Sequence, residues 1–390
     1  MYCVWVRTVT QVKKGEEMAA PSIRLGMHVP AKPPVGDIKN AVRLCRLTGL
    51  DAAMFWDHFQ DFFPQVLWNE DFTWYAKENP WAHEHYEYQV LLGYLSGVAG
   101  NLQLGVGVTE PLRRHPVLLA QAMMTLSHMT KRPPILGIGA GERENTEPYG
   151  VPMEKPVGKL EEALQIVQQC YTARGPFSFS GEHFQLDNAV MDLIPGDGKT
   201  PPVWIAAHGP RMLRLTGQYG DGWHPTFISS AEEYGDRLST IRRHAREAGR
   251  DPDAIVPSMQ VATIIAPTDE RAREILKTRA ARFLGLMTPD EVFRSAGMTH
   301  PLGAGFRGYV DIKPEEMDAD VLENALDQVP VEFLEETLIW GSPERVAGAL
   351  QEYGEAGLRH VVISPVSVLH SKEIMNYLPR GLFSLRRKLH

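Results

Sequence analysis

The sequence has few cysteines, no long apolar run and no excess of positive charge. Its three cysteines among 390 residues lie far apart and form no CxxC pair, which excludes a disulfide scaffold and a cysteine zinc site and favours a reducing cytoplasm. No apolar stretch reaches the roughly 18 residues of a membrane span. With 40 Lys+Arg against 48 Asp+Glu and a net charge of -8, the chain lacks the basic face that nucleic-acid binding requires.

The N-terminal end carries charges where a secretory signal would be apolar. Residues 13–18 read KKGEEM, so no signal peptide is expected. Regular patterning begins at Ile23. We therefore expect residues 1–20 to form a loose extension, with Met1 and Met18 as alternative starts.

Eight short apolar runs alternate with amphipathic segments along the rest of the chain. Runs that are apolar on both faces are typical of parallel strands covered by helices. The predicted strands are Ile23–Val29, Ala52–Trp56, Leu102–Thr109, Ile135–Ala140, Val203–Ala207, Asp221–His224, Met259–Ala266 and His360–Ser364. The predicted helices are Asp37–Thr48, Tyr88–Gly100, Pro116–Met129, Val157–Ala173, Pro210–Tyr219, Ala231–Gly249, Glu270–Leu284 and Pro343–Ala356, with a basic helix at the C-terminal end.

Eight strand–helix units predict an α/β fold of the (β/α)8 TIM-barrel type rather than an open doubly wound sheet. Such a barrel needs about 250 residues. We therefore expect one barrel domain over residues 21–390, with insertions at about 59–87, 175–200 and 285–340. The hydrophobic share of 43% and charged share of 23% suit a globular domain with a large core.

Polar and small residues follow the predicted strands, where barrel enzymes place their active sites. The segments at these ends are Asp57-His58, Gly107-Val108-Thr109-Glu110, Gly139-Ala140-Gly141-Glu142, Ala206-Ala207-His208-Gly209 and Gly222-Trp223-His224. Each alone is more often a helix cap or a satisfied polar group. Their recurrence on successive strand ends predicts one active site at the barrel mouth.

Three common kinds of site do not fit these residues. The stretch GIGAGE places Glu142 where a dinucleotide fingerprint has its third glycine. The histidines lack HxH and HExxH spacing, so no metal site is expected. A serine hydrolase is disfavoured because no GxSxG elbow is present.

The glycines of the GIGAGE stretch have two possible roles. They either relieve crowding inside the barrel or let a flat ring lie against the backbone.

The segments LGVGVT, LGIGAGERENTEPYG and WIAAHGPRMLRLTGQYGDGW, together with the Asp-His pair, resemble the luciferase-like superfamily of flavin and deazaflavin oxidoreductases. Within it the chain is most similar to the coenzyme F420-dependent group. There it most resembles the ketoreductases, and more distantly the sugar-phosphate dehydrogenases. The resemblance extends from about Arg24 to the C-terminal helix. It implies a (β/α)8 barrel that usually dimerises and holds a flavin-type ring at its mouth.

The resemblance also implies roles for individual residues. Asp57 matches a ring-binding Asp, His58 a catalytic His, and Glu142 a catalytic Glu. Gly107-Val108 matches a cis peptide that forms a bulge behind the ring. The remaining implied cofactor contacts are Thr109, Ala140 and Asn145 at the ring, and Ala207, His208 and Gly209 at the cofactor phosphate.

The chain departs from the sugar-phosphate enzymes at two positions. The resemblance places Ser229 and Glu336 where those enzymes have cations. The aromatic segment 59–87 is either a self-packed lid or an apolar wall for the substrate. We therefore expect an apolar, lipid-like ketone or secondary alcohol as the small-molecule substrate.

These residues predict an F420-dependent ketoreductase or alcohol dehydrogenase. The sequence favours Glu142 as the proton donor and His58 as the group that polarises the oxygen, with the reverse assignment open. FMN is the alternative cofactor, in a two-component monooxygenase. A non-catalytic flavin or deazaflavin binder is the third reading, which the intact Asp57, His58 and Glu142 set disfavours. A homodimer in the cytoplasm is expected.

Overall fold

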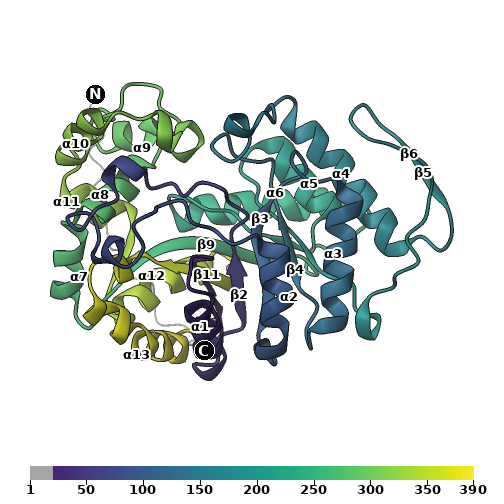
Figure 1. Ribbon diagram of the computed structural model, residues 1–390, viewed down its shortest axis with the longest axis horizontal. Helices are drawn as coiled ribbons and strands as arrows, with labels where there is room; N and C mark the ends of the chain where they lie inside the picture. Colours follow the sequence, from purple (N-terminus) through teal and green to yellow (C-terminus); the bar gives the residue numbers. More distant parts are fainter. Residues whose placement is uncertain (1–20) are drawn as a thin grey trace, which may run out of the picture.

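The computed structural model describes residues 21–390 and forms a closed barrel of eight parallel strands surrounded by helices (Figure 1). The predicted extension at residues 1–20 and the two alternative starts lie outside the described residues. The barrel strands are β1 (Arg24–His28), β2 (Ala52–Phe55), β3 (Gln103–Thr109), β4 (Ile135–Ile138), β7 (Val203–Ile205), β8 (Gly222–Trp223), β9 (Val256–Ile265) and β11 (His360–Pro365). The predicted (β/α)8 fold is confirmed.

The barrel closes because the long strand β9 pairs with both β8 and β11. Its first residues pair with β8 (Gly222 opposite Val256), its middle with β11 (Val361 opposite Met259), and β11 continues the circle to β1. Side chains from most strands are fully buried, as expected for strands covered on both faces. The carboxyl ends of all strands therefore meet at one mouth.

Helices surround the barrel and start at residues suited to that position. Ser230, Ser342 and Ser371 each accept a hydrogen bond from a backbone N–H in the first turn of their helices, which satisfies an otherwise unpaired donor. The surrounding helices are α1 (Val35–Leu47), α2 (Tyr88–Ala99), α3 (Pro116–Met129), α4 (Pro156–Thr172), α5 (Pro210–Tyr219), α6 (Ala231–Glu247), α12 (Pro343–Glu355) and α13 (Lys372–Leu389). Among the described residues, no helix is long and apolar enough to cross a membrane.

The predicted single helix Glu270–Leu284 is wrong. Two helices, α7 (Asp269–Leu276) and α8 (Arg279–Leu286), occupy this stretch. The side chain of Thr278 caps α8 by accepting a hydrogen bond from the N–H of Ala281. A residue with its side chain turned to a backbone donor favours a helix start over a helix interior. The apolar spacing continues through the break, which is why the sequence pattern did not show it.

Several elements outside the eight strand–helix units were not predicted. Strand β10 (Ile339–Gly341) pairs in parallel with the end of β9, and an antiparallel hairpin of β5 (Phe177–Ser180) and β6 (Gln185–Ala189) projects from the barrel. The remaining helices are α9 (Asp290–Ser295), α10 (Ala319–Asp327), α11 (Val331–Thr337), and the 3-10 helices η1 (Gln65–Leu67), η2 (Trp74–Lys77), η3 (Glu147–Tyr149), η4 (Gly196–Gly198), η5 (Gly308–Asp311), η6 (Pro314–Glu316) and η7 (Val366–Leu369).

A second hydrophobic core lies beside the barrel mouth. Leu67, Trp68 and Phe72 of the segment after β2 pack together with Phe283 of α8 and Phe293 of α9. In Figure 1 this purple segment runs close to α8 and α11. The aromatic segment therefore packs on the helices after β9 rather than on itself alone. This segment and these helices together cover one side of the mouth.

Candidate active site

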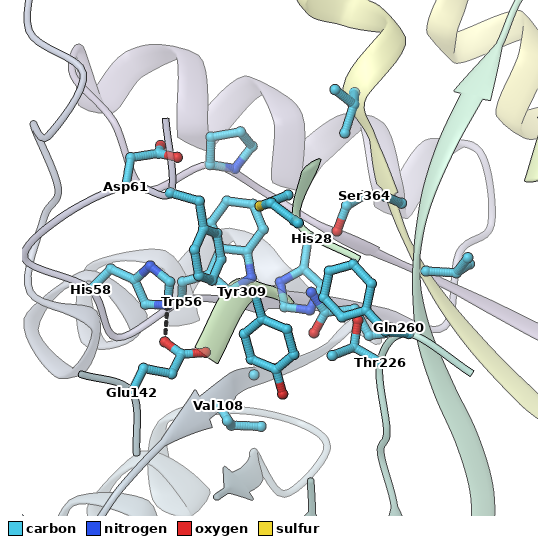
Figure 2. Close-up of a pocket in the computed structure, with 18 of the residues that line it drawn as sticks. His28, Trp56, His58, Asp61, Val108, Glu142, Thr226, Gln260, Tyr309 and Ser364 are labelled. Carbon is cyan, nitrogen blue, oxygen red and sulfur yellow. Dashed lines mark ion pairs between the residues drawn. The ribbon is translucent and has the colours of Figure 1, made fainter. Parts of the chain in front are cut away.

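A large cavity opens at the carboxyl ends of the barrel strands. Its volume is about 600 Å³, within the range of small-molecule and cofactor sites. Most of the side chains that line it are apolar, and a few polar groups converge on its centre (Figure 2). The cavity therefore has the composition expected of an enzyme that handles an apolar ligand.

The structure brings ten of the eleven predicted site residues to this cavity. They are Asp57, His58, Gly107, Val108, Thr109, Ala140, Glu142, Asn145, His208 and Gly209. Ala207 lies behind the wall: it is fully buried and its carbonyl oxygen accepts a hydrogen bond from Trp223 Nε1 at 2.9 Å. Its neighbour Ala206, directly after β7, lines the cavity instead.

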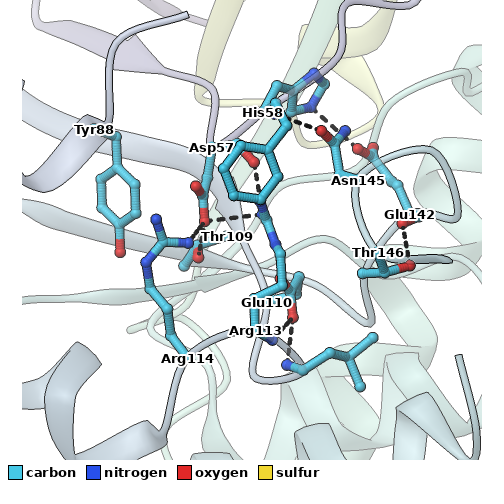
Figure 3. Close-up of polar contacts among 12 residues, drawn as sticks. Asp57, His58, Tyr88, Thr109, Glu110, Arg113, Arg114, Glu142, Asn145 and Thr146 are labelled. Atoms are coloured by element: carbon cyan, nitrogen blue, oxygen red, sulfur yellow. Dashed lines mark hydrogen bonds and ion pairs between the residues drawn. The ribbon is translucent and has the colours of Figure 1, made fainter. Parts of the chain in front are cut away.

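His58 and Glu142 form an ion pair inside the cavity (Figures 2 and 3). Nε2 of His58 lies 3.1 Å from Oε2 of Glu142. Burial alone would lower the pKa of His58, but the charges of Glu142, Asp61 and Asp57 and the hydrogen bond to Glu142 raise it overall. Burial likewise opposes the charge of Glu142, yet the charge of His58 and its hydrogen bond lower the pKa of Glu142 overall. The pair is therefore held as imidazolium and carboxylate.

Glu144 is a second buried acid next to this pair, and it stays neutral. Burial and the negative charge of Glu142 raise the pKa of Glu144 to about 10. Oε1 of Glu144 accepts a hydrogen bond from Asn145 Nδ2 at 3.3 Å, and Oε2 has no partner within residues 21–390. Two nearby carboxyl groups in a buried site cannot both ionise, so only Glu142 carries the charge.

Asn145 connects the loop after β4 to the segment after β2. Its Oδ1 accepts hydrogen bonds from the backbone N–H groups of Phe59 at 2.6 Å and Gln60 at 3.0 Å. Thr146 Oγ1 donates to the carbonyl oxygen of Glu142 at 2.8 Å. These three hydrogen bonds hold the loop of Glu142 against the segment that follows His58, and Asn145 is used within this contact.

Asp57 is anchored by a dense polar network at the start of α3 (Figure 3). Its Oδ2 accepts a hydrogen bond from Thr109 Oγ1 at 2.6 Å, lies 3.1 Å from Arg113, and pairs with Arg114. Glu110 in turn pairs with Arg113. The two arginines, in the segment LRRH after the third strand, were not predicted. The available sequence signal was the adjacent pair Arg113 and Arg114, which follows the end of the third strand while Asp57 follows the end of the second.

The wall behind the cavity is built from small residues. The peptide between Gly107 and Val108 is cis, as the resemblance implied. A Cβ on Gly139 would lie 3.3 Å from Val108 Cγ2 and 3.6 Å from the side chain of Ala206. Added side-chain atoms here would fill the space between neighbouring strand ends. A flat ring could lie against this wall, which supports the functional reading of the glycines.

Two further histidines face the cavity with unused ring nitrogens: His28, which was not predicted, and His224, which was named at the end of the sixth predicted strand without a role. Within residues 21–390, neither ring nitrogen of His28 has a hydrogen-bond partner. In His224, Nδ1 lies 2.7 Å from Ser258 Oγ, whereas Nε2 has no partner in the same range. Burial keeps the pKa of His28 well below its usual value, with the neighbouring His224 and His58 as further causes, and lowers that of His224 to about 3. The ring of His28 stacks on Trp56 at 5.2 Å. The sequence signal for His28 was its position at the end of the first strand.

These features fit a flavin-type cofactor. Buried polar groups in proteins are normally hydrogen-bonded, so the unpaired nitrogens of His28 and His224 suit the polar edge of a bound ring. His208 and Gly209 line the cavity where α5 begins, and a helix N-terminus attracts phosphate. Burial and the charge of Arg237 lower the pKa of His208 to about 4, so its ring is neutral. Within residues 21–390, no group of three or more His, Cys, Asp or Glu is placed to hold a metal ion.

Comparisons with known proteins agree with this fold. A profile of the luciferase-like monooxygenase family matches residues 17–360. The phthiodiolone/phenolphthiodiolone dimycocerosates ketoreductase of Mycobacterium sp. (strain JLS) is 35% identical over 369 residues, covering 93% of this chain and 96% of the relative.

Two solved structures share the fold at low sequence identity. An F420-dependent secondary alcohol dehydrogenase in complex with an F420-acetone adduct has a TM-score of 0.72 and 18% identity, covering 95% of this chain and 99% of that one. The FMN-bound oxygenating constituent of 3,6-diketocamphane monooxygenase from Pseudomonas putida has a TM-score of 0.65 and 17% identity, covering 94% and 98%. The profile match and the ketoreductase relative show that this chain belongs to the luciferase-like monooxygenase family.

Proposed function

We propose that this protein is an F420-dependent oxidoreductase that moves a hydride between the deazaflavin and an apolar ketone or secondary alcohol. The observation that carries the proposal is the His58–Glu142 ion pair, 3.1 Å apart, facing a mostly apolar cavity at the barrel mouth. Hydride transfer to a ketone builds an alkoxide that must be protonated as it forms. The ketoreductase relative at 35% identity supports the same chemistry.

The cofactor would supply the hydride, and the chain would hold the ring and the carbonyl face to face. Val108, Gly139 and Ala140 form the flat wall for the ring. His28 and His224 would donate or accept hydrogen bonds at its polar edge, and His208 with Gly209 would receive the phosphate through their backbone N–H groups. Asp57 also lines the cavity and would contact the ring, and Thr109 donates a hydrogen bond to its carboxylate. Fixing both reactants in this way supplies much of the rate enhancement in such enzymes.

We infer that His58 is the immediate proton donor. The sequence favoured Glu142, but an ionised carboxylate has no proton to give, whereas the raised pKa of His58 keeps its imidazolium protonated. The proton on Nε2, the nitrogen that faces Glu142 in this structure, would pass to the substrate oxygen as a hydride adds to the carbonyl carbon and the π electron pair moves onto that oxygen. Glu142 would hold the imidazolium in place, and the neutral Glu144 beside it avoids a second negative charge.

Titration of the purified protein tests the cofactor. We expect F420 to bind at least tenfold more tightly than FMN, a difference of about 1.4 kcal/mol, as measured by equilibrium fluorescence. The oxidation of reduced F420 by a ketone, and the reduction of F420 by the matching alcohol, would then show activity and the favoured direction. Equal or tighter binding of FMN would favour the monooxygenase, and binding of F420 without turnover of any ketone or alcohol would favour a non-catalytic binder.

We further propose that the protein works as a homodimer in the cytoplasm. The buried Cys45 and Cys170 are free thiols, which suits a reducing compartment. The homodimer rests on the family resemblance alone. Light scattering of the purified protein at micromolar concentration would measure its mass, and a monomer would contradict this part of the proposal.

A further inference from the structure

Glu144 is a buried acid two positions after Glu142, and it is not part of the cavity surface. The residue is 0% exposed. Its neighbours Glu142, Arg143 and Asn145 all line the cavity, whereas Glu144 does not. A ligand in the cavity therefore meets Glu142 directly, and any effect of Glu144 on a reaction has to pass through another residue.

The two oxygens of the Glu144 carboxyl group have different surroundings. Oε1 accepts a hydrogen bond from Asn145 Nδ2 at 3.3 Å. Oε2 is buried and receives no hydrogen bond from a donor within residues 21–390. A buried carboxylate oxygen that accepts nothing costs free energy, whereas a carboxylic acid uses one of its oxygens as an O–H donor. Oε2 is therefore the oxygen that carries the proton of Glu144.

The acceptor for this proton is the carboxylate of Glu142. Besides burial and the neighbouring charges, a side-chain hydrogen bond between the two carboxyl groups raises the pKa of Glu144 and helps to lower that of Glu142. Oε2 of Glu142 also lies 3.1 Å from Nε2 of His58. Glu142 thus accepts from two donors, an imidazolium and a carboxylic acid. Hydrogen bonds to a charged acceptor are among the strongest in proteins.

Two further polar groups face these acids from other elements. After burial and the contacts with His58 and Glu144, the charge of Arg113 helps to lower the pKa of Glu142. Burial and the charges of both acids raise the pKa of Tyr309 in η5, so its phenol is neutral. Neither Arg113 nor Tyr309 changes its charge near neutral pH, so they act as a constant background.

The groups that face His58 also keep one charge state near neutral pH. Besides burial and the neighbouring glutamate, the charges of Asp61 and Asp57 act on the pKa of His58. Burial opposes the charge of Asp61, but Lys32 and His85 hold the pKa of Asp61 well below its usual range. The ring of His85 lies 6.1 Å from that of His58, and burial lowers the pKa of His85 to about 4. His85 is therefore neutral.

We propose that Glu144 is a positioning residue whose protonated carboxyl group donates a hydrogen bond to Glu142 and stabilises the charge that remains there when His58 gives up its proton. This inference rests on the proposed function for the fate of the proton, but the contact itself can be tested without cofactor or substrate. Once the imidazolium is neutral, Glu142 is a buried carboxylate without its cation, which is costly unless hydrogen bonds compensate. The O–H of Glu144 reduces this cost, so His58 releases its proton more readily.

The test compares Glu144→Met and Glu144→Gln in the full chain. The methionine variant removes the donor, whereas the glutamine variant keeps an N–H for Glu142 and an oxygen for Asn145. The pKa of His58 is measured by NMR of labelled histidine side chains in the cofactor-free protein. We expect Glu144→Met to raise this pKa, with an increase of about tenfold in proton affinity, the effect of losing one hydrogen bond to a charged group. Glu144→Gln should stay close to the wild type.

Kinetics with reduced F420 and a ketone provide the second readout. Glu144→Met should lower kcat severalfold with KM little changed, because the hydrogen bond gains strength only as the proton leaves His58. Glu144→Gln should restore kcat. Glu147→Gln is the matched control on the same loop, because Glu147 pairs with Lys313 at 2.9 Å and does not act on the pKa of His58. It should change neither the pKa of His58 nor kcat.

Infrared spectroscopy replaces the methionine variant if that protein does not fold. The wild type at pH 7 should show the band of a buried carboxylic acid, and Glu144→Gln should lack it. The absence of this band from the wild type, or an unchanged pKa of His58 in Glu144→Met, would overturn the inference.

The kinetic outcomes separate this role from proton donation and from the proposed function. Equal losses of kcat in Glu144→Met and Glu144→Gln would also overturn the inference, because Glu144 would then supply a proton itself. A raised pKa of His58 in Glu144→Met that Glu144→Gln restores would support it, even if no ketone oxidises reduced F420. In that case the proposed function would fail and the role of Glu144 toward the pair would stand.

Discussion

Nε2 of His58 lies 3.1 Å from Oε2 of Glu142 and joins the end of the second barrel strand to the loop after the fourth. The two residues are separated by 84 positions in the sequence (142 minus 58), yet each shifts the pKa of the other toward the charged form. An acid–base pair of this kind stores one proton at a defined atom. It is the feature on which the proposed chemistry depends most.

The first prediction concerns the pH dependence of ketone reduction. If the His58 imidazolium gives the proton, kcat/KM should fall as pH rises through the pKa of His58, which lies above the usual value of about 6.5. Glu142→Gln removes the negative charge that raises this pKa, so the falling limb should move to lower pH. His58→Asn should lower kcat by about 10²–10⁴-fold, the usual effect of losing general acid catalysis.

Pre-steady-state hydride transfer as a function of pH, with F420 affinity measured alongside, would check this. Cofactor affinity should stay nearly constant in both variants. A Glu142→Gln protein that loses the larger factor in kcat, with the pH limb unmoved, would return the role of donor to Glu142.

The second prediction concerns the stability of the network around Asp57. Asp57→Ala would leave the buried guanidinium of Arg113 and the partly buried one of Arg114 without their shared partner. Removing one member of a buried ion pair typically costs 3–5 kcal/mol. We expect a loss of about 3 kcal/mol in the free energy of unfolding, in addition to weaker F420 binding by about 1.5–3 kcal/mol.

Urea denaturation and F420 titration would be compared in Asp57→Ala and Thr109→Val. The threonine variant removes one hydrogen bond to Asp57 and no charge, so it should cost only about 1 kcal/mol in stability. An Asp57→Ala protein as stable as the wild type would show that the network contributes little to the fold.

The third prediction concerns His28. Both its ring nitrogens are buried without a partner within residues 21–390, and such a group lowers stability unless a ligand satisfies it. His28→Leu should therefore leave the melting temperature unchanged or raise it, while F420 affinity falls about tenfold, or 1.4 kcal/mol. Differential scanning calorimetry with and without F420 would measure both. Unchanged F420 affinity would exclude His28 from the cofactor site.

The fourth prediction concerns sugar phosphates. Ser229, which stands where sugar-phosphate enzymes have a cation, donates a backbone hydrogen bond to Glu233 at 2.9 Å. Glu233 in turn pairs with Arg237, so neither Ser229 nor Glu233 offers a positive charge to a phosphate. We therefore expect no reduction of F420 by glucose 6-phosphate, as followed by the loss of F420 absorbance. Robust reduction by this sugar would contradict the apolar-substrate reading.

The sequence by itself determined the barrel and most of its mouth. Apolar runs such as Ala52–Phe55 and Val203–Ile205 are too short and too apolar for surface helices, and their alternation with helices leaves few other folds. Because parallel strands end at one rim, the order of the chain alone placed Asp57, His58 and Glu142 near one another. Local propensity and spacing are enough for such conclusions.

Only the tertiary structure decided which of these groups carries charge and what covers them. The ionisation of the His58–Glu142 pair depends on burial and on distances across separate loops, and the neutrality of Glu144 depends on its closeness to Glu142. The packing of Trp68 and Phe72 against Phe283 joins segments more than 200 residues apart, which no local pattern encodes. Electrostatic and packing energies depend on distance in space, whereas sequence spacing fixes distance only within a helix, a strand or a short turn.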